Sequence, residues 1–278
     1  MTFFSAVFLG LVQGLAEFLP ISSSGHLAFF QEFLGLMDVE KENLFFDVLL
    51  HLGTLAAVFA AYWGEIKALV LELFTMVGVR KLPRGEKPDG LSRRMIFFLI
   101  LATLPLVLVL PIKDKVEGLY TNTFFIGGAF LLTGTVLFLS DRMGRGSKNL
   151  KTATVLDAVL VGCGQAVAVV PGLSRSGTTI ACGMARGFER EFAVKFSFLL
   201  SIPAVLGANL LSLVDAIQAG IDWSLMPLYL VGVLVAAVSG YFAIWLLKFI
   251  TRKGNFGGFC YYCWGAGLVT LILSLINH

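Results

Sequence analysis

Charged residues are scarce in this sequence. Only 14% of its 278 residues are Asp, Glu, Lys or Arg, against about a quarter in an average soluble domain, whereas 57% are hydrophobic. The mean hydropathy is correspondingly high, at +0.86. This composition excludes an ordinary soluble domain and indicates an integral membrane protein. The net charge of +3 is modest and says little by itself, and no nucleic-acid partner is expected.

Histidine and cysteine are also few, with three and four residues respectively. Cys260 and Cys263 form a C-x-x-C, but no second ligand pair accompanies them, so the cysteines are interpreted as ordinary membrane-helix thiols. The chain has no Walker-type loop, no G-x-G-x-x-G and no metal-ligand histidine cluster. The first residues lack a basic start and a small-residue cleavage site, so they are expected to belong to the fold rather than to a removable signal peptide.

A short stretch at residues 10–26 occurs a second time at residues 162–177. Each copy is an apolar helical run broken by a proline and a Ser/Gly cluster. The copies differ where chemistry is expected, because the first supplies a carboxylate and an imidazole and the second supplies a guanidinium. The ungapped alignment pairs Gly10 with Gly162, Gln13 with Gln165, Ala16 with Ala168, Ser22 with Ser174, Ser24 with Ser176 and Gly25 with Gly177, and it sets Glu17 against Val169, Ser23 against Arg175 and His26 against Thr178.

The apolar runs predict an all-α polytopic membrane protein. A spanning helix needs about 20 apolar residues. Two pairs of shorter runs, each joined by a polar turn, predict re-entrant helical hairpins, which are tolerated in lipid only where protein or a wet cavity covers the turn. A single membrane domain over 1–278 is therefore expected, with six spanning helices and two re-entrant hairpins. The half-helices are expected at about 2–19, 26–37, 154–170 and 176–187, and the long helices at about 44–78, 95–112, 122–140, 191–214, 225–250 and 256–276.

The charges in the connectors predict an inverted repeat. Cytoplasmic loops hold an excess of Lys and Arg. Four connectors together hold 16 of these residues and are expected inside, whereas three others hold only 3 and are expected outside. This assignment places both chain ends outside and makes the two hairpins enter the membrane from opposite faces. Repeat units at about 1–141 and 152–278, each of five helical pieces, would then bring the two polar turns together near the bilayer midplane. The basic connectors are 80–94, 141–151, 186–195 and 248–253, and the others are 38–43, 113–120 and 215–223.

The first turn carries groups suited to acid-base or nucleophilic chemistry. Gln13 and Glu17 are four residues apart and so share one helix face, either in a packing seam or in a site, and a buried carboxylate requires a partner. Ser23 and His26 lie at the start of a helix, where backbone N–H groups favour an anion. The two flanking serines, Ser22 and Ser24, could either cap the helix that starts near His26 or contact an anion.

The second turn carries groups suited to binding phosphate. Arg175 lies between apolar runs, and a charge at that depth indicates function. Its planar guanidinium suits a phosphate or diphosphate, and small residues around it expose backbone donors. The hydroxyls that accompany it are those of Ser174, Ser176, Thr178 and Thr179.

Three further polar residues are expected inside helices. His51 follows Asp47 by four residues, which favours an intrahelical pair, with a supporting role at the site as the other interpretation. Asn209 is expected to form an interhelical hydrogen bond, and Asp157 to lie at a helix end.

The motifs together resemble the signatures of a known family. Gln13-x-x-x-Glu17, Pro20-Ile-Ser-Ser-Ser-Gly-His26 and Pro171-Gly-Leu-Ser-Arg-Ser-Gly-Thr-Thr179 are similar to those of the bacterial undecaprenyl-diphosphatase family of the bacitracin-resistance type, over the whole chain. The resemblance implies a multi-pass protein of the bacterial cytoplasmic (inner) membrane that removes the terminal phosphate of undecaprenyl diphosphate, a polyprenyl diphosphate lipid, and so recycles the carrier lipid of cell-wall synthesis. It leaves open whether the chain forms a homodimer. The resemblance carries over Glu17, Ser23, His26, Arg175, Ser174, Ser176 and Thr179 as site positions.

The same residues suggest a mechanism. Ser23 would attack the outer phosphorus, His26 and Glu17 would move protons, and Arg175 would hold the transferring phosphoryl group. His26 as the nucleophile is the rival assignment. A divalent cation, Mg or Ca, could bridge the diphosphate and Glu17, although the sequence offers no certain metal site. Substrate contacts are expected from Gln13, Ser22, Ser24, Ser174, Ser176, Thr178 and Thr179.

Two other functions use similar features. An inverted-repeat phosphate or lipid-phosphate transporter or flippase would also have broken helices and an arginine in mid-membrane, but it needs no reacting serine or histidine. A phosphatase with the phospholipid-phosphatase signature would need a histidine after Ser174-Arg175 and a basic first motif, and the chain has neither. The connector charges predict that the active site is reached from the outer face.

Overall fold

The structure is a computed structural model that describes residues 1–34, 42–82, 87–143, 146–254 and 256–277. The predicted connector at 38–43 and the end of the predicted half-helix at 26–37 lie largely outside the described residues. Within the described ranges the chain forms twelve α-helices and three short 3-10 helices, with no β-strand. Six helical segments are long and apolar enough to cross a membrane, which confirms an all-α, multi-pass membrane protein. They are Leu44–Ala61, Gly90–Glu117, Thr123–Arg142, Arg190–Ala219, Trp223–Lys253 and Phe256–Ile276.

The first half of the chain corrects two predicted helices. The helix expected at 44–78 is broken at Tyr62, which has φ −127° and ψ 27°, and Gly64 lowers helix propensity just beyond the break. The helix expected at 95–112 gives way after Thr103 to a tight 3-10 turn, because Pro105 and Pro111 cannot donate backbone hydrogen bonds. The elements are α1 (Phe3–Phe18), α2 (Ser23–Leu34), α3 (Glu42–Ala61), α4 (Trp63–Met76), α5 (Gly90–Thr103), η1 (Leu104–Ile112), α6 (Lys113–Glu117) and α7 (Thr123–Arg142).

The second half contains the helices that the sequence predicts, with boundaries that differ by a few residues. Asn209 donates to the Val48 carbonyl of α3 at 3.3 Å, which is the expected interhelical bond. Asp157 lies in the first turn of α8, as expected. The elements are α8 (Val155–Val167), α9 (Arg175–Ala185), α10 (Arg190–Ala219), η2 (Trp223–Leu225), α11 (Met226–Lys253), η3 (Phe256–Gly258) and α12 (Phe259–Asn277).

The two halves start in the same way. Thr2 caps α1 and Thr154 caps α8, each with a capping box in which the threonine and the residue three positions later exchange hydrogen bonds. Each of these short helices then packs closely on a partner, α1 on α11 and α8 on α5. A Cβ atom on Gly10 would lie 2.5 Å from the Gly232 carbonyl oxygen, and one on Gly162 would lie 2.7 Å from Ala102 Cα. The glycines at these two repeat positions therefore allow the helices to pack closely.

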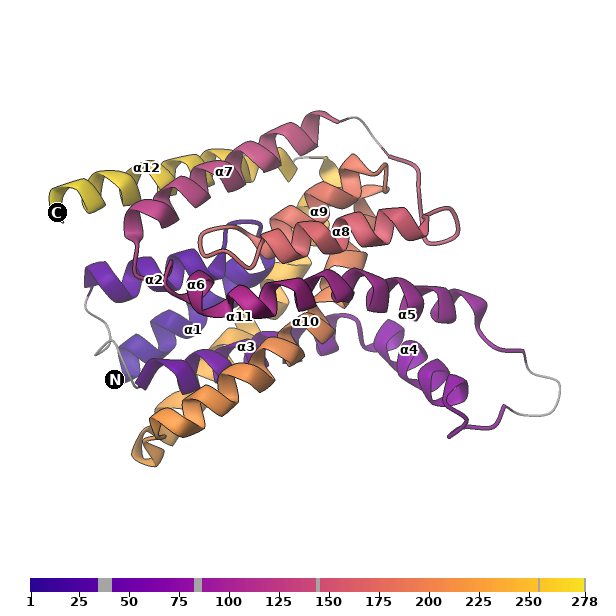
Figure 1. The fold of residues 1–278 in the computed structure, drawn as a ribbon, viewed down its shortest axis with the longest axis horizontal. Helices are drawn as coiled ribbons and strands as arrows, with labels where there is room; N and C mark the ends of the chain where they lie inside the picture. Colours follow the sequence, from indigo (N-terminus) through magenta and orange to yellow (C-terminus); the bar gives the residue numbers. More distant parts are fainter. Residues whose placement is uncertain (35–41, 83–86, 144–145, 255, 278) are drawn as a thin grey trace.

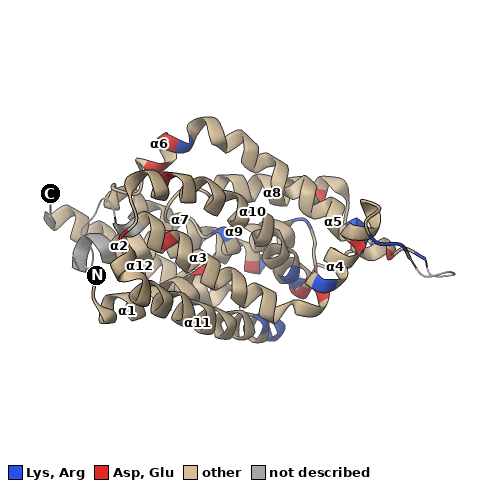
Figure 2. Ribbon diagram, turned by 90° about the horizontal axis from the view of Figure 1, so that it is seen from below, with Lys and Arg blue, Asp and Glu red and all other residues tan. Residues whose placement is uncertain are grey.

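The long helices pack against one another in pairs. α3 packs against α10 and α11, and α7 packs against α12 (Figure 1). The two chain ends lie at one end of the molecule, whereas most Lys and Arg residues gather at the other, which we call the basic end (Figure 2). The α1–α2 pair extends toward the end with the termini, and the α8–α9 pair extends toward the basic end.

Candidate active site

The two polar turns touch each other. Ser176 Oγ, in the first turn of α9, donates to the carbonyl oxygen of Leu19, which follows α1, at 3.4 Å. A Cβ atom on Gly25 would lie only 2.9 Å from Gly172 Cα, so no side chain fits between these backbones. Thr133 of α7 supports the second turn, because its hydroxyl donates to the Gly172 carbonyl at 3.1 Å. Two segments far apart in the sequence therefore form one site.

Each turn ends in a helix cap of the same kind, in which a serine hydroxyl accepts a hydrogen bond from the amide three residues later. Ser22 Oγ accepts a hydrogen bond from the Gly25 amide at 3.3 Å, and Ser174 Oγ accepts one from the Gly177 amide at 3.1 Å. Ser22 also adopts φ +72°, a left-handed conformation that costs energy in a non-glycine residue and is found at functional sites. The hydroxyls of Ser24 and Ser176 stand 3.4 and 3.3 Å from those of the capping serines. The repeated serines thus shape the turns, and Ser23 and Arg175 occupy the equivalent position between them.

Glu17 is the centre of the site. Its Oε1 pairs with Arg175 Nη2, and its Oε2 accepts hydrogen bonds from Ser23 Oγ at 2.6 Å and from Gln13 Nε2 at 3.2 Å. The Glu17 side chain is 7% exposed and that of Arg175 is 20% exposed. A carboxylate so deeply buried needs a compensating charge, and Arg175 supplies it. Four residues that the sequence selected from both repeats are in contact here.

His26 has a fixed ring orientation but does not contact Ser23. Its Nδ1 is 2.7 Å from the Ser22 carbonyl oxygen, which can only accept, so Nδ1 carries a proton. Its Nε2 is 2.8 Å from the hydroxyl of Tyr262 on α12. In the neutral ring Nε2 is an acceptor, and the Tyr262 hydroxyl therefore donates to it. Sequence reasoning missed Tyr262, because no local pattern distinguishes it from the other aromatic residues of this helix.

His51 approaches the same carboxylate from α3. Its Nδ1 donates to the backbone carbonyl of Asp47 at 2.8 Å, so the two residues do pair within the helix, through the backbone of Asp47. Its Nε2 lies 3.9 Å from Glu17 Oε2, a gap that a water molecule or a substrate hydroxyl could bridge. The structure therefore supports the second interpretation of His51, in which it assists the site.

The two threonines after Arg175 are placed differently. Thr179 is buried, and its hydroxyl lies 2.6 Å from Ser197 Oγ of α10 and donates to the Arg175 carbonyl at 2.8 Å. Thr179 thus anchors the start of α9 to α10. Thr178 makes no side-chain hydrogen bond within the part of the chain that the structure describes.

The donor set is poor for a protein-held metal. In the described residues no group of three or more His, Cys, Asp or Glu side chains could hold an ion. Both oxygens of Glu17 already accept hydrogen bonds, one of them from a cationic guanidinium. A divalent cation at Glu17 would compete with these donors and would take most of its oxygen ligands from elsewhere.

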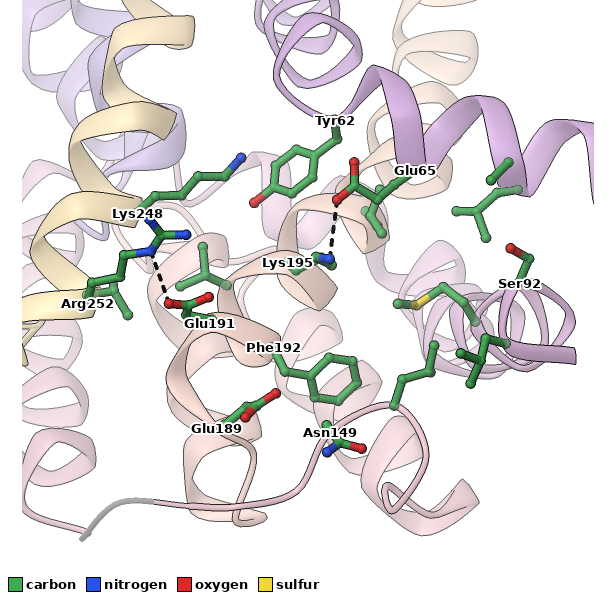
Figure 3. Close-up of a pocket in the computed structure, with 18 residues that line it drawn as sticks. Tyr62, Glu65, Ser92, Asn149, Glu189, Glu191, Phe192, Lys195, Lys248 and Arg252 are labelled. Atoms are coloured by element: carbon green, nitrogen blue, oxygen red, sulfur yellow. Dashed lines mark hydrogen bonds and ion pairs between the residues drawn. The ribbon is translucent and has the colours of Figure 1, made fainter. Parts of the chain in front are cut away.

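Three buried rings close the site toward the basic end. Phe18, next to Glu17, packs edge-on against Phe198 with ring centroids 5.4 Å apart, and Phe198 packs against Tyr62 at 6.0 Å. Each of the three residues is at most 2% exposed. The rings form an apolar layer between the turns and the cavity shown in Figure 3, in which Tyr62 is a lining residue.

Comparison with known proteins agrees with these features. Residues 6–269 match the sequence model of the family described as "Bacitracin resistance protein BacA". The chain is 44% identical over 281 residues to an undecaprenyl-diphosphatase of Carboxydothermus hydrogenoformans, with 99% of this chain and 98% of the relative covered. It is 40% identical over 277 residues to one of Alkaliphilus metalliredigens (99% and 100% covered) and 41% identical over 283 residues to one of Methanobrevibacter smithii (100% and 99% covered). The chain belongs to the bacitracin resistance protein BacA family.

Proposed function

We propose that this protein is a membrane phosphatase that hydrolyses undecaprenyl diphosphate to undecaprenyl phosphate and phosphate, and so recycles the carrier lipid of cell-wall synthesis. The observation that carries this proposal is the contact of Ser23 and Arg175 with the two oxygens of Glu17. A hydroxyl held on a carboxylate beside a guanidinium can transfer a phosphoryl group. Relatives that cover the whole chain and bear the name undecaprenyl-diphosphatase support the substrate.

The first step is an attack by Ser23 Oγ on the terminal phosphorus. Glu17 Oε2, 2.6 Å away, takes the serine proton as the Oγ–P bond forms and the bond to the bridging oxygen breaks. Undecaprenyl phosphate leaves with the electron pair of that bond. Protonation of Glu17 removes the charge that holds Arg175, which is then free to bind the phosphoryl oxygens.

The second step is hydrolysis of the phosphoserine. Glu17 first passes its proton to the leaving undecaprenyl phosphate. Water then attacks the phosphorus and gives one proton to His26 or to Glu17, and the P–Oγ bond breaks as that group returns a proton to Ser23 Oγ. His26 can accept at Nε2 once the Tyr262 hydroxyl moves from it. Free phosphate and Ser23 are regenerated.

The nucleophile can be identified by trapping the phosphorylated residue and mapping it. The geometry supports Ser23, because its hydroxyl is bonded to a base, whereas His26 Nε2 is occupied by Tyr262. We expect Ser23→Ala to abolish trapping with His26 intact. A phosphohistidine at position 26 that persists in Ser23→Ala would assign the nucleophile to His26.

We further propose that the two helix pairs are re-entrant hairpins of an inverted repeat. The contacts support a two-fold relation, since α1 on α11 corresponds to α8 on α5, and α3 on α11 corresponds to α10 on α5. The two-fold axis of the repeat would pass between α3 and α10 and between α7 and α12, because the helices of each pair correspond to each other. The two hairpins would enter a bacterial inner membrane from opposite faces and meet in mid-membrane.

The orientation follows from the basic end. Lys and Arg favour the cytoplasmic side, so the termini and the mouth of the active site would face outward. Cysteines introduced at Arg80 and at Tyr120 in a Cys163→Ser background test this with an impermeant maleimide on intact cells. Labelling at position 120 but not at position 80 is expected, and the reverse pattern would overturn the orientation.

The activity is tested by phosphate release from undecaprenyl diphosphate with purified protein. Arg175→Ala should lower turnover by about 10²-fold or more, because a preorganised charge for the phosphoryl group is lost. Arg142→Ala is the matched control, since Arg142 lies over the Phe138 ring at 3.9 Å, outside the site. No phosphate release by the unmodified protein, or equal rates in the Arg175 variant, would overturn the proposal.

A further inference from the structure

A second cavity lies at the basic end, separate from the turns. It has a volume of about 500 Å³ and is enclosed by α4, α5, α10, α11 and the loop before α8 (Figure 3). No residue that bonds to Glu17 lines it. Its polar wall carries three cationic and three acidic side chains, namely Lys195, Lys248, Arg252, Glu65, Glu189 and Glu191.

Two of the cations are already neutralised. Lys195 Nζ pairs with Glu65 at 3.2 Å, and Arg252 Nε pairs with Glu191 at 3.0 Å, as the dashed lines in Figure 3 show. Glu189, the remaining acidic residue, is exposed at the start of α10. The third cation, Lys248, and Glu189 are thus the two charged groups of the wall that form neither of these ion pairs.

Lys248 has no carboxylate partner among the described residues. Its ammonium lies over the Tyr62 ring, 3.7 Å from the centroid, and 3.4 Å from the Ala61 carbonyl oxygen. A ring face and one carbonyl satisfy an ammonium only in part, because three donors are available. The Lys248 ammonium therefore keeps donor capacity toward the cavity, although Glu65 on the same wall acts on it electrostatically.

The Thr251 hydroxyl supplies an independent sign of a ligand. Thr251 follows Lys248 by three residues on α11 and therefore shares its helix face. It lines the cavity and is 2% exposed, yet its Oγ1 has no hydrogen-bond partner in the structure. A buried polar atom without a partner costs about 1–3 kcal/mol, so such atoms usually meet a ligand or water.

An apolar groove begins at the same place. It has a volume of about 350 Å³, runs between α4, α5, η1 and α10, and shares Leu69 with the polar cavity. Its lining is almost wholly aliphatic, which suits a hydrocarbon chain. The residues that continue it away from Leu69 include Leu73, Ile96, Ile100, Leu104 and Pro203.

We propose that the cavity and the groove together bind a membrane glycerophospholipid, with its phosphodiester at Lys248 and Thr251 and one acyl chain along Leu69 and Leu73. The Lys248 ammonium, which makes no ion pair within 4 Å among the described residues, can donate to the single negative charge of a phosphodiester. A phosphate monoester carries about −1.5 to −2 at neutral pH and would need a second free cation. The site is separate from the active site and does not depend on the reaction proposed above.

The test is lipid retention by the purified full-length protein in native mass spectrometry, with palmitoyl-oleoyl phosphatidylglycerol as the probe. Lys248→Met should weaken binding by about tenfold through loss of a charge-assisted hydrogen bond. Lys253→Met is the matched control, because Lys253 also lies over an aromatic ring of α11, at 4.2 Å from Phe249, but does not line the cavity. Binding by the control should equal that of the unmodified protein.

A second variant separates binding from folding. Thr251→Val keeps the shape of the side chain and removes a hydroxyl that has no partner, so the unfolding temperature should not fall, whereas phosphatidylglycerol binding should weaken by about threefold. Equal binding by the Lys248→Met, Thr251→Val and unmodified proteins would overturn the proposal.

Binding of other ligands tests whether a long-chain glycerophospholipid is the molecule that occupies the cavity and the groove. Dihexanoyl phosphatidylglycerol and inorganic phosphate should bind at least about tenfold more weakly than the long-chain lipid, because they cannot fill the groove. Equal binding of these short probes would overturn the role of the groove. Tighter, Lys248-dependent binding of undecaprenyl phosphate than of phosphatidylglycerol would overturn the choice of a glycerophospholipid.

Discussion

The guanidinium of Arg175, at the first residue of α9, pairs with the carboxylate of Glu17, near the end of α1, although the two residues are 158 positions apart. The pair joins the two turns of the repeat through the groups in which the repeats differ. It also holds the Glu17 carboxylate beside the Ser23 hydroxyl and places the Arg175 guanidinium in the same site. Structure and proposed catalysis therefore depend on the same contact.

Glu17→Gln should lower the rate of phosphate release by about 10²–10⁴-fold, because the amide can still hold Ser23 but cannot take its proton. The Michaelis constant should change much less. Glu191→Gln, which removes a carboxylate that is 64% exposed, is the control and should leave the rate unchanged. Near-normal turnover in Glu17→Gln would mean that another group activates the nucleophile.

Arg175→Lys should not restore activity. Lysine keeps the positive charge but lacks the planar guanidinium, whose several N–H groups can contact Glu17 first and two phosphoryl oxygens afterwards. We expect kcat to fall by about 10²-fold, with the variant still folded. Steady-state kinetics on undecaprenyl diphosphate and a thermal unfolding scan provide the measurement, and a rate within a few fold of the original would show that charge alone suffices.

Tyr262→Phe should slow the reaction by about three- to tenfold, because His26 Nε2 loses the donor that orients the ring. Its neighbour offers a matched control, since Tyr261 is 69% exposed and packs edge-on against Trp264. Tyr261→Phe should therefore behave like the unmodified enzyme. Equal rates for the two variants would remove Tyr262 from the site.

Gly162→Ala should lower the free energy of unfolding by about 1–3 kcal/mol, because the added methyl group would overlap the backbone of Ala102 on α5. Gly128→Ala makes the same change on α7, where nothing lies within 4 Å, and should raise stability by about 0.5–1 kcal/mol through helix propensity. Denaturation in detergent compares the two. The opposite order of stabilities would contradict the close packing of α8 on α5.

The stability of the basic end should depend on pH through Asp157. Burial acts to raise the pKa of Asp157, but hydrogen bonds from Thr154, Lys148 and Arg186 outweigh it and lower the pKa from 3.8 to about 2. A lowered pKa means that the unfolded chain binds the proton more readily, so the stabilisation is complete above about pH 4 and is lost as the pH falls toward 2. The unfolding temperature of Asp157→Asn should vary less with pH over this window than that of the unmodified protein. Parallel curves would show that Asp157 does not contribute.

The sequence by itself determined the helical architecture. Long apolar runs can satisfy their backbone groups in lipid only as helices, and the Ser/Gly clusters after Pro20 and Pro171 had to interrupt them. It also indicated Glu17 and Arg175, because an ion in an apolar chain needs a partner. These properties are local or compositional, so no tertiary contact is required to recognise them.

Only the tertiary structure decided which groups meet. It placed Ser23 rather than His26 on Glu17, and it brought Tyr262 to His26 from 236 residues away. It also set His51 between the Asp47 backbone carbonyl and the Glu17 carboxylate. It also broke the expected long helix at Tyr62, where the ring packs between Phe198 and Lys248. Hydrophobic periodicity reports which residues share a helix face, but the contacts between faces depend on how all the helices pack at once, and that information is not local.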